Sequence, residues 1–353
     1  MSHDSTHRAT DWRQSRYSRQ VLLPQIGPAG QERLRAANVT LIGCGALGTV
    51  LADQLVRAGV GRLRLVDRDY VELNNLQRQV LFDESDVATG SPKAVAAAQR
   101  LAAVNSDVAI EPIIADACAT NIEQFVEGAD VLLDGTDNFE TRFLINDVAV
   151  KHGIPWVYGA CVGIEGMIMP ILPRQTPCLR CIWDQPPPPG MNPTCDTAGV
   201  LGPLVHLVAS RQAIEAIKIL TGALGEVRRC LIQINAWTGA MDCFDMQGAY
   251  EPGRCTCCGR GQYEYLAAGG ARTATLCGRD AVQIPGSRSG VDLDAVARRI
   301  AGAAKSPPCL NRYLLRFDVD RFTVTLFRDG RAIIKGTGDP NEARTVYAKY
   351  IGQ

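Results

Sequence analysis

Apolar positions in the first part of the chain alternate between two kinds of spacing. Short runs of aliphatic and β-branched residues occupy 39–42, 63–67, 109–114 and 129–134, and helical spacing occupies 47–58 and 94–104. Glycine and polar residues separate these segments. Alternation of this kind predicts an α/β fold: a Rossmann-like, doubly wound, largely parallel sheet with helices on both faces.

The pattern changes in the second half of the chain. The run 186–190, four prolines and a glycine, cannot form regular helix or sheet and indicates an exposed connection. Helical spacing resumes at 204–220 and returns at 293–304 and 341–350, and strands are expected at 313–319, 322–327 and 331–335. We therefore expect a disordered tail at 1–15, a large domain at 16–262 and a small α/β domain at 271–353.

Composition excludes several classes of protein. Hydrophobic residues make up 46% and charged residues 21%, as in ordinary globular proteins, and 37 basic residues balance 37 acidic ones. Nothing in this balance favours a nucleic-acid partner. No apolar run reaches the length of about 18–20 residues that crosses a membrane, and the polar N-terminus resembles no signal peptide, so a cytoplasmic location is expected. Most of the 13 cysteines are therefore expected to be reduced thiols.

A glycine loop follows the first predicted strand and opens the first predicted helix. Gly43, Gly45 and Gly48 allow a tight turn and close approach of phosphate groups to the backbone, and a helix N-terminus favours negative charge. Asp67 ends the second strand, where an acid can bind ribose hydroxyls. This pattern indicates a nucleotide site and leaves NAD and ATP equally open. A tight turn without a ligand is the alternative.

Polar residues further along the chain favour ATP. Asn75, Arg78 and Lys93 follow the ribose acid, and Asp137 follows the strand at 129–134. Hydride transfer does not need several cations, whereas phosphoryl chemistry uses Arg and Lys to neutralise phosphate charge and an acid to hold Mg²⁺. Taken singly, Arg78 or Lys93 is more often a solvated surface charge and Asp137 a turn or helix cap.

These motifs, in this order, resemble the MoeB/ThiF/HesA family of adenylyltransferases, which are related to ubiquitin-activating enzymes. The matching segments are residues 16–20, 43–48, 66–69, 74–79, 92–93 and 136–138, two Cys-x-x-Cys pairs and Ala198-Gly199-Val200. The resemblance covers about the first 260 residues. It implies adenylation of the C-terminal glycine of a ubiquitin-like sulfur-carrier protein ending in Gly-Gly, in a thiamine, molybdopterin or similar sulfur-transfer route.

The resemblance also implies roles for individual residues. Asp67 would hold the ATP ribose and Asp137 would hold Mg²⁺. Arg19 would reach the triphosphate bound to the neighbouring subunit, because members of the family act as homodimers. The residues on the phosphates would be Asn75, Arg78 and Lys93.

Two pairs of cysteines, about 75 residues apart, suit a structural zinc ion with four thiolate ligands. Cys178 and Cys181 form the first pair. In the second, the spacing admits Cys255 or Cys257 beside Cys258; the two-residue gap and the family pattern favour Cys255. Scattered free thiols are the alternative.

The other cysteines lead to weaker expectations. Cys195 matches a family position that in ThiF-like members can link covalently to the carrier or handle sulfur, and a spectator thiol is the alternative. Cys44 and Cys161 are expected to be small buried side chains. Cys277 is expected to be a packed thiol at a strand end rather than a sulfur acceptor.

The C-terminal region resembles, less closely, an extension of some bacterial ThiF-like proteins. It is too short for a rhodanese domain and lacks the loop pattern of one, so docking of the carrier or of a downstream enzyme is the expected role. Two other functions stay open for the whole chain: an NAD-dependent oxidoreductase using the same glycine loop, and an inactive nucleotide-binding scaffold. Retention of the phosphate and metal residues argues against both.

Overall fold

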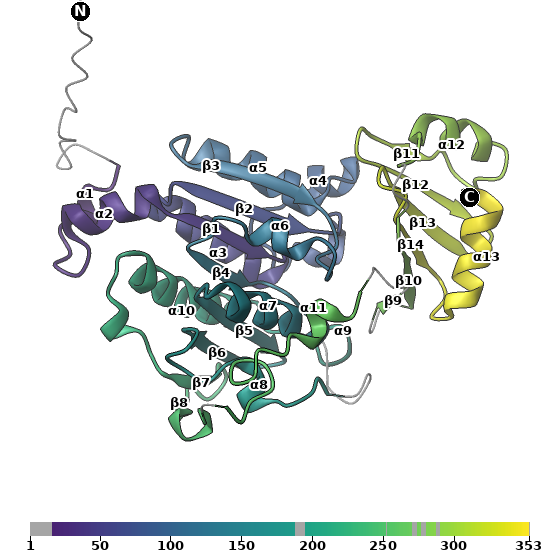
Figure 1. Ribbon diagram of the computed structural model, residues 1–353. Coiled ribbons are helices and arrows are strands. Elements are labelled where there is room, and N and C mark those ends of the chain that lie inside the picture. The colour runs from purple at the N-terminus through teal and green to yellow at the C-terminus, as the bar shows by residue number, and fades with distance from the viewer. Residues whose placement is uncertain are drawn as a thin grey trace, which may run out of the picture.

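The computed structural model describes residues 16–187, 195–251, 253–269, 274–276, 280–286 and 290–352. An eight-stranded sheet, in the order β3-β2-β1-β4-β5-β6-β7-β8, forms the first unit (Figure 1). Its strands are β1 (Asn38–Ile42), β2 (Arg62–Asp67), β3 (Ala109–Ile114), β4 (Val131–Asp134), β5 (Trp156–Val162), β6 (Glu165–Ile171), β7 (Cys230–Asn235) and β8 (Met241–Asp245). The strands from β3 to β5 pair in parallel, and β6, β7 and β8 extend the sheet antiparallel. The expected doubly wound, largely parallel sheet is confirmed.

Helices cover both faces of this sheet. One face carries α3 (Ala46–Ala58), α5 (Lys93–Val104) and α10 (Gly202–Leu220), and the other carries α6 (Ile122–Val126) and α7 (Phe139–His152). Side chains of a strand alternate between faces, so Leu41 packs with the first set of helices and Ile42 with the second. Both faces are therefore buried, as a parallel sheet requires.

Short helices complete the first unit. They are α1 (Ser18–Val21), α2 (Gly27–Ala36), η1 (Leu73–Asn75), α4 (Glu84–Thr89), α8 (Leu179–Ile182), α9 (Cys195–Ala198), η2 (Leu224–Glu226), η3 (Gln247–Ala249) and α11 (Glu264–Ala267). A disulfide joins Cys230 and Cys243 across β7 and β8, which the sequence did not predict. Nine other cysteines in the described residues are free thiols. Among the described helices, none is long and apolar enough to span a membrane.

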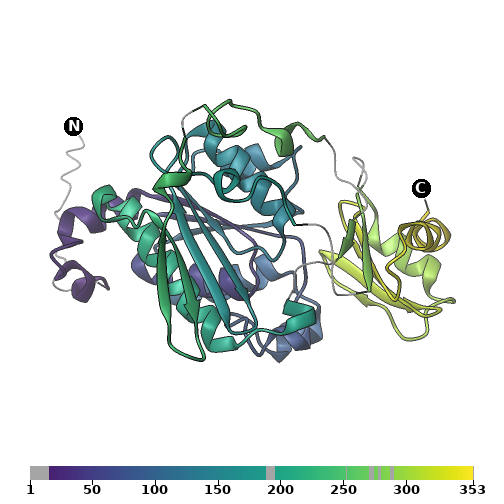
Figure 2. The same cartoon turned by 90° about the horizontal axis from the view of Figure 1, so that it is seen from below.

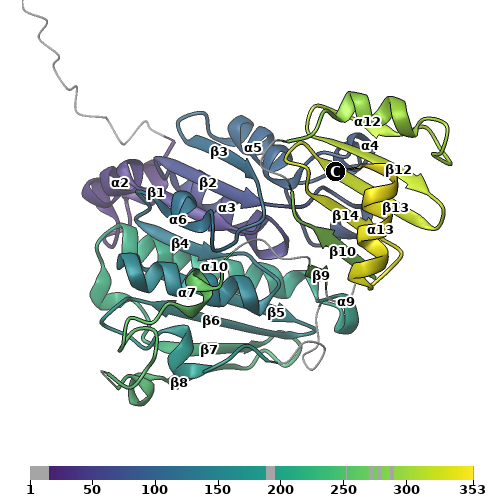
Figure 3. The same cartoon turned by 45° about the vertical axis from the view of Figure 1, so that its right-hand side comes forward.

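A six-stranded antiparallel sheet, in the order β11-β12-β13-β14-β10-β9, forms the second unit. Its strands are β9 (Ala274–Leu276), β10 (Ala281–Ile284), β11 (Cys309–Leu310), β12 (Leu314–Val319), β13 (Phe322–Phe327) and β14 (Ala332–Lys335). Helices α12 (Leu293–Ile300) and α13 (Pro340–Tyr350) cover one face of it and share its apolar core (Figure 3). The helix expected over 293–304 ends at Ile300, where hydrogen-bonded turns replace it.

The two units meet beyond the carboxyl ends of β2 and β3. Arg331, between β13 and β14, donates to the backbone carbonyl of Arg68, which directly follows β2. Helices α1 and α2 lie at the other end of the molecule (Figures 1 and 2). The second unit is therefore next to the edge of the first sheet at which a nucleotide-binding protein of this architecture carries its ligand.

Candidate functional site

The glycine loop lies between β1 and α3, as expected, and it contacts the loop that follows β4. Gly43 has φ of +92°, and a Cβ atom there would lie 2.6 Å from the carbonyl group of Gly135. A Cβ atom on Gly48 would lie 2.0 Å from the carbonyl oxygen of Gly43. Gly45 is different, because its nearest neighbours would be 3.9 Å away. Gly43 and Gly48 are thus required by the fold itself, whereas Gly45 leaves room at the start of α3, where phosphate groups bind in such loops.

Asp67 ends β2 beside this loop, and its carboxylate orders the backbone on both sides. One oxygen accepts a 2.6 Å hydrogen bond from the Cys44 amide, and the other accepts a 2.7 Å bond from the Asp69 amide. Burial raises the pKa of Asp67, and the charge of Lys93 acts against that increase. Cys44 is fully buried, as expected, and burial raises the pKa of its thiol, so it is an unreactive packing residue.

Lys93 opens α5 and is buried rather than solvated. Its side chain is 4% exposed, and Nζ lies 3.5 Å from a carboxylate oxygen of Asp69. Its amide donates to the Asp69 carbonyl at 2.9 Å. A buried ammonium group needs negative partners, and Asp69 together with Asp67 supplies them. The surface-charge interpretation of Lys93 is therefore wrong, because the loop after β2 folds over its side chain.

Asn75, Arg78 and Gln79 follow on η1 and the turn after it. Asn75 is buried, and its side-chain oxygen accepts a 3.1 Å bond from the Glu72 amide. Arg78 is half-buried and donates to the Asn74 carbonyl at 2.7 Å. Gln79 is buried beside Gly45, and its Oε1 atom has no hydrogen-bond partner among the described residues. Gln79 is a candidate binding residue that sequence reasoning included in the motif but did not single out.

Asp137 is exposed in the loop between β4 and α7, where the Asn138 amide group lies 3.4 Å from its carboxylate. Neighbouring Asp134 is instead buried and pairs with Arg142 at 3.0 Å. Arg142 also donates to the carbonyls of Thr136 and Gly159, so it fixes the loop that presents Asp137. Sequence reasoning missed Arg142, because a single arginine in a helical pattern does not reveal its burial.

Parallel pairing brings these segments to one edge of the sheet. Ile42 of β1 is level with Val66 of β2 and Asp134 of β4. The glycine loop, Asp67, Lys93, η1 and Asp137 therefore lie around the carboxyl ends of neighbouring strands.

Arg19 does not join this cluster within its own chain. It is exposed on α1, and its neighbour Gln20 donates to the carbonyl of Ala58, the last residue of α3. The glycine loop opens the other end of α3, about 20 Å away for a helix of this length. An arginine side chain cannot cover that distance, so within one chain Arg19 is remote from the loop.

Cys195 begins α9, but its side chain lies outside the described residues, as does all of Cys277. The segment that follows α9 joins the edge of the sheet. The Gly163 amide, at the end of β5, donates to the Gly199 carbonyl at 2.8 Å. The backbone of Cys195 is therefore near the edge formed by the carboxyl ends of β4 and β5, the edge at which Asp137 also lies.

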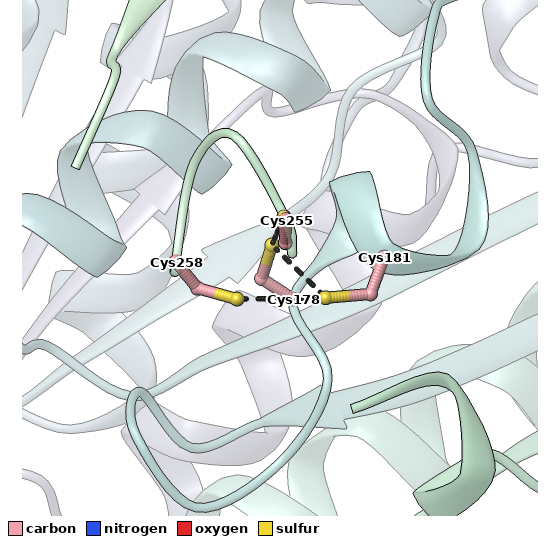
Figure 4. Close-up of side chains that lie close together, drawn as sticks. All are labelled: Cys178, Cys181, Cys255 and Cys258. Carbon is pink, nitrogen blue, oxygen red and sulfur yellow. Dashed lines mark hydrogen bonds between the residues drawn. The ribbon is translucent and has the colours of Figure 1, made fainter. Parts of the chain in front are cut away.

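The four predicted cysteine ligands form a second cluster, between α8 and the turn before α11 (Figure 4). The Sγ atoms of Cys178 and Cys255 are 3.7 Å apart, those of Cys181 and Cys258 are 3.5 Å apart, and all four lie within 4.8 Å of one another. Tetrahedral zinc with Zn–S bonds of about 2.3 Å places its sulfurs about 3.8 Å apart. The donor set therefore fits zinc.

Cys257 lies outside this cluster. It is fully buried, and its sulfur accepts a 3.3 Å hydrogen bond from the side-chain amide of Asn146 on α7. The oxygen of the same amide accepts from the backbone of Leu179 at 2.8 Å. Asn146 thus holds both cysteine-bearing segments against α7. The choice of Cys255 over Cys257 as the clustered thiol agrees with the structure.

The fold and the polar edge of its first sheet define a Rossmann-like α/β protein of the nucleotide-binding type. The chain belongs to the ThiF family, which it matches over residues 17–257.

Among similar proteins, the sulfur carrier protein ThiS adenylyltransferase of Bacillus subtilis (strain 168) is 44% identical over 340 residues, 96% of this chain and 99% of that one. A sulfur carrier protein adenylyltransferase of Thermus thermophilus is 45% identical over 212 residues, 59% of this chain and 78% of that one. A crystal structure of E. coli MccB with succinimide shares the fold, with a TM-score of 0.61 and 24% identity over 70% of this chain and 75% of that one.

Proposed function

We propose that this protein uses ATP to adenylate the C-terminal glycine of a ubiquitin-like sulfur-carrier protein and releases pyrophosphate. The observation that carries the proposal is the assembly of the glycine loop, Asp67 and the buried Lys93 at one sheet edge. The sequence identity of 44% to the ThiS adenylyltransferase of Bacillus subtilis, over nearly the whole of both chains, supports the same activity. Hydride transfer does not require a buried lysine beside the phosphate-binding loop, whereas adenylation uses such a cation to neutralise charge on the phosphates.

The reaction requires two negatively charged groups to approach each other. A carboxylate oxygen of the carrier attacks the α-phosphorus of ATP, a new O–P bond forms, and the bond to the departing pyrophosphate breaks. The amides at the start of α3 and the cations of Lys93 and Arg78 would lower the repulsion between carboxylate and phosphates. Asn75 would donate to a phosphate oxygen and Asp67 would accept from the ribose.

Two further contributions belong to the proposal. Asp137, exposed at the same edge, would hold Mg²⁺, which neutralises charge on the phosphates when bound. Arg19 would act on the ATP of a second copy of the chain in a homodimer, since it is remote from its own glycine loop. The site would then be complete only in the dimer.

Zinc held by Cys178, Cys181, Cys255 and Cys258 would have a structural role. These thiols join the segment before the proline run to the segment after β8, and all four coordination positions would be filled by sulfur. We also propose that residues 16–262 and 271–353 are separate domains, with α11, which packs on α7, in the segment between them.

Exchange of labelled pyrophosphate into ATP tests the activity. Exchange is expected with a carrier that ends in Gly-Gly and is expected to disappear when the last glycine of that carrier is deleted. Exchange of equal rate without any carrier, or no exchange with a panel of Gly-Gly carriers, would overturn the proposed function.

A further inference from the structure

The face of the second sheet that α12 and α13 leave uncovered contains a residue of the first unit. Tyr70, three positions after Asp67, is 4% exposed and packs in an apolar cluster with Leu314, Phe327 and Ile333. The charged group of Lys335 lies 5.7 Å from the centre of its ring. The loop that follows the ribose acid is thus partly built into the core of the second unit.

Arg331 fixes the backbone of this loop. Its guanidinium group donates to the Arg68 carbonyl at 2.8 Å and to the Gln283 side chain at 3.4 Å. Gln283 donates to Asp116 at 2.5 Å, and Asp116 pairs with the Arg68 side chain at 3.0 Å. These four residues close a ring of contacts across the two units. Because the Arg68 carbonyl directly follows Asp67, the ring restricts where the ribose acid can move.

Lys335 acts on the other end of the same loop. Its ammonium group pairs with the carboxylate of Glu72. Glu72 in turn bonds to Asn75 through its backbone: the Glu72 carbonyl accepts from the Asn75 amide at 2.9 Å, and the Glu72 amide donates to the Asn75 side-chain oxygen at 3.1 Å. Through Glu72, the charge of Lys335 therefore helps to fix the position of the turn that contains Asn75 and Arg78. Burial acts against that charge, but Tyr70 and Glu72 outweigh it and raise the pKa of Lys335.

A third contact holds the neighbouring loop, which leads to Lys93. The side-chain amide of Asn311 donates to the carbonyls of Thr89 and Gly90 at 3.0 and 3.3 Å. This loop is joined to the first one, because the Val71 amide donates to the Ser91 carbonyl at 2.9 Å. The second unit consequently touches both irregular segments that carry the candidate phosphate-binding residues.

We propose that the second sheet braces the nucleotide loop 67–75, and that Lys335 is a positioning residue for ATP binding through Glu72 and Asn75. The inference rests on the proposed function for its substrate. Residues 68–72 have no helix or strand of their own, so the conformation of this loop depends on contacts with the segments around it. Contacts from a folded sheet reduce that freedom before ATP arrives, so less ordering remains to oppose binding.

The test compares Lys335→Met with Lys349→Met in the full-length protein. Methionine keeps much of the apolar contact with Tyr70 and removes the charge. Lys349 is exposed on α13 and pairs with Asp320 inside the second unit, so its replacement is the matched control. We expect Lys335→Met to raise the KM for ATP in the exchange reaction about fivefold to twentyfold, with the KM for the carrier within about twofold of the parent. Lys335→Arg is expected to restore most of the ATP affinity.

Glu72→Gln removes the charge from the other partner of the same ion pair, the one in the first unit. Glutamine still accepts a hydrogen bond but carries no charge. It is expected to raise the KM for ATP to a similar extent, and the double variant is expected to be no worse than either single variant. Suppose that the parent exchanges pyrophosphate. An unchanged KM for ATP in both single variants would then overturn the brace. The brace would also be overturned if the KM values for ATP and for the carrier rose equally, in proportion to a lower unfolding midpoint of the variants.

Direct binding of a fluorescent ATP analogue separates the two proposals. If the parent binds the analogue but exchanges no pyrophosphate with any carrier, the proposed function fails. The brace still predicts weaker analogue binding by Lys335→Met than by Lys349→Met. Equal binding by these two variants would refute it.

Discussion

The nucleotide edge and the cysteine cluster are assembled in different ways. The edge draws single residues from loops after β1, β2 and β4, and parallel pairing of those strands brings them together. The cluster joins two short segments, each with a pair of cysteines three residues apart, and holds them against α7 through Asn146. A residue exposed at the edge can therefore be changed with little effect on folding, whereas a change in the cluster loosens the structure that supports the edge.

Asp137→Asn gives the sharpest form of this contrast. The side chain is exposed, so the unfolding midpoint is expected to stay within about 2 °C of the parent. Loss of the proposed metal-binding carboxylate is expected to slow pyrophosphate exchange by about 100-fold or more. Glu140→Gln, exposed in the first turn of α7, is the matched control. Exchange by Asp137→Asn at the parent rate would refute the assigned metal role.

Cys258→Ser is expected to have the opposite profile. Removal of one thiolate from a four-sulfur site weakens metal binding, and the free energy of unfolding is expected to fall by about 3 kcal/mol or more. Exchange would decline only as the folded fraction declines. Chemical denaturation together with zinc analysis by mass spectrometry measures both effects, with Cys118→Ser as the control outside the cluster. A parent protein that contains no zinc and keeps full stability in a chelator would contradict the proposed site.

Arg19→Ala tests whether the edge is completed by a second subunit. Exchange is expected to fall about 30-fold with little change in stability, since the residue is exposed on α1. Arg35→Ala, on α2, serves as the control. Mixing Arg19→Ala with Asp137→Asn is expected to restore about a quarter of the parent rate, because half of the dimers are mixed and each contains one intact site. No recovery in a confirmed mixed dimer would place Arg19 outside the neighbouring site.

Cys195→Ser is expected to have the smallest effect on exchange, less than about twofold, because adenylation needs no thiol nucleophile. Incubation of the parent with ATP and carrier, followed by intact mass measurement with and without excess thiol reagent, detects a covalent link. The balanced step is attack of the Cys195 thiolate on the carrier adenylate, which releases AMP and forms a thioester that excess thiol reagent cleaves. Such a thiol-cleavable adduct that Cys195→Ser lacks would identify Cys195 as the linking thiol. An adduct that persists in the variant would exclude that role.

The strand and helix pattern and the local motifs were predictable, because they depend on short-range spacing. Gly43 to Gly48 and Asp67 lie at the end of strands whose apolar runs are unambiguous, and Cys178 and Cys181 share one short segment. The burial of Lys93 was not predictable, because it depends on how the loop at Asp69 folds over the start of α5.

Long-range contacts were also beyond the reach of the sequence pattern. The sequence gives no sign that Tyr70 is more than an aromatic residue in a loop, yet it packs against residues more than 200 positions further along the chain. In the sequence, Arg331 and Lys335 are polar positions of a short strand and its turn, and their partners Arg68 and Glu72 belong to the loop after β2 in the first unit. No spacing rule within either segment encodes that pairing.

The central claim is that the sheet edge around Gly45, Lys93 and Asp137 activates the terminal carboxylate of a carrier protein with ATP. The most direct measurement is the intact mass of a Gly-Gly carrier after incubation with the protein, ATP and Mg²⁺. The claim predicts a carrier heavier by one AMP group, formed by the parent and formed far more slowly with Asp137→Asn. A carrier of unchanged mass under conditions in which the protein binds ATP, across a panel of Gly-Gly carriers, would contradict it.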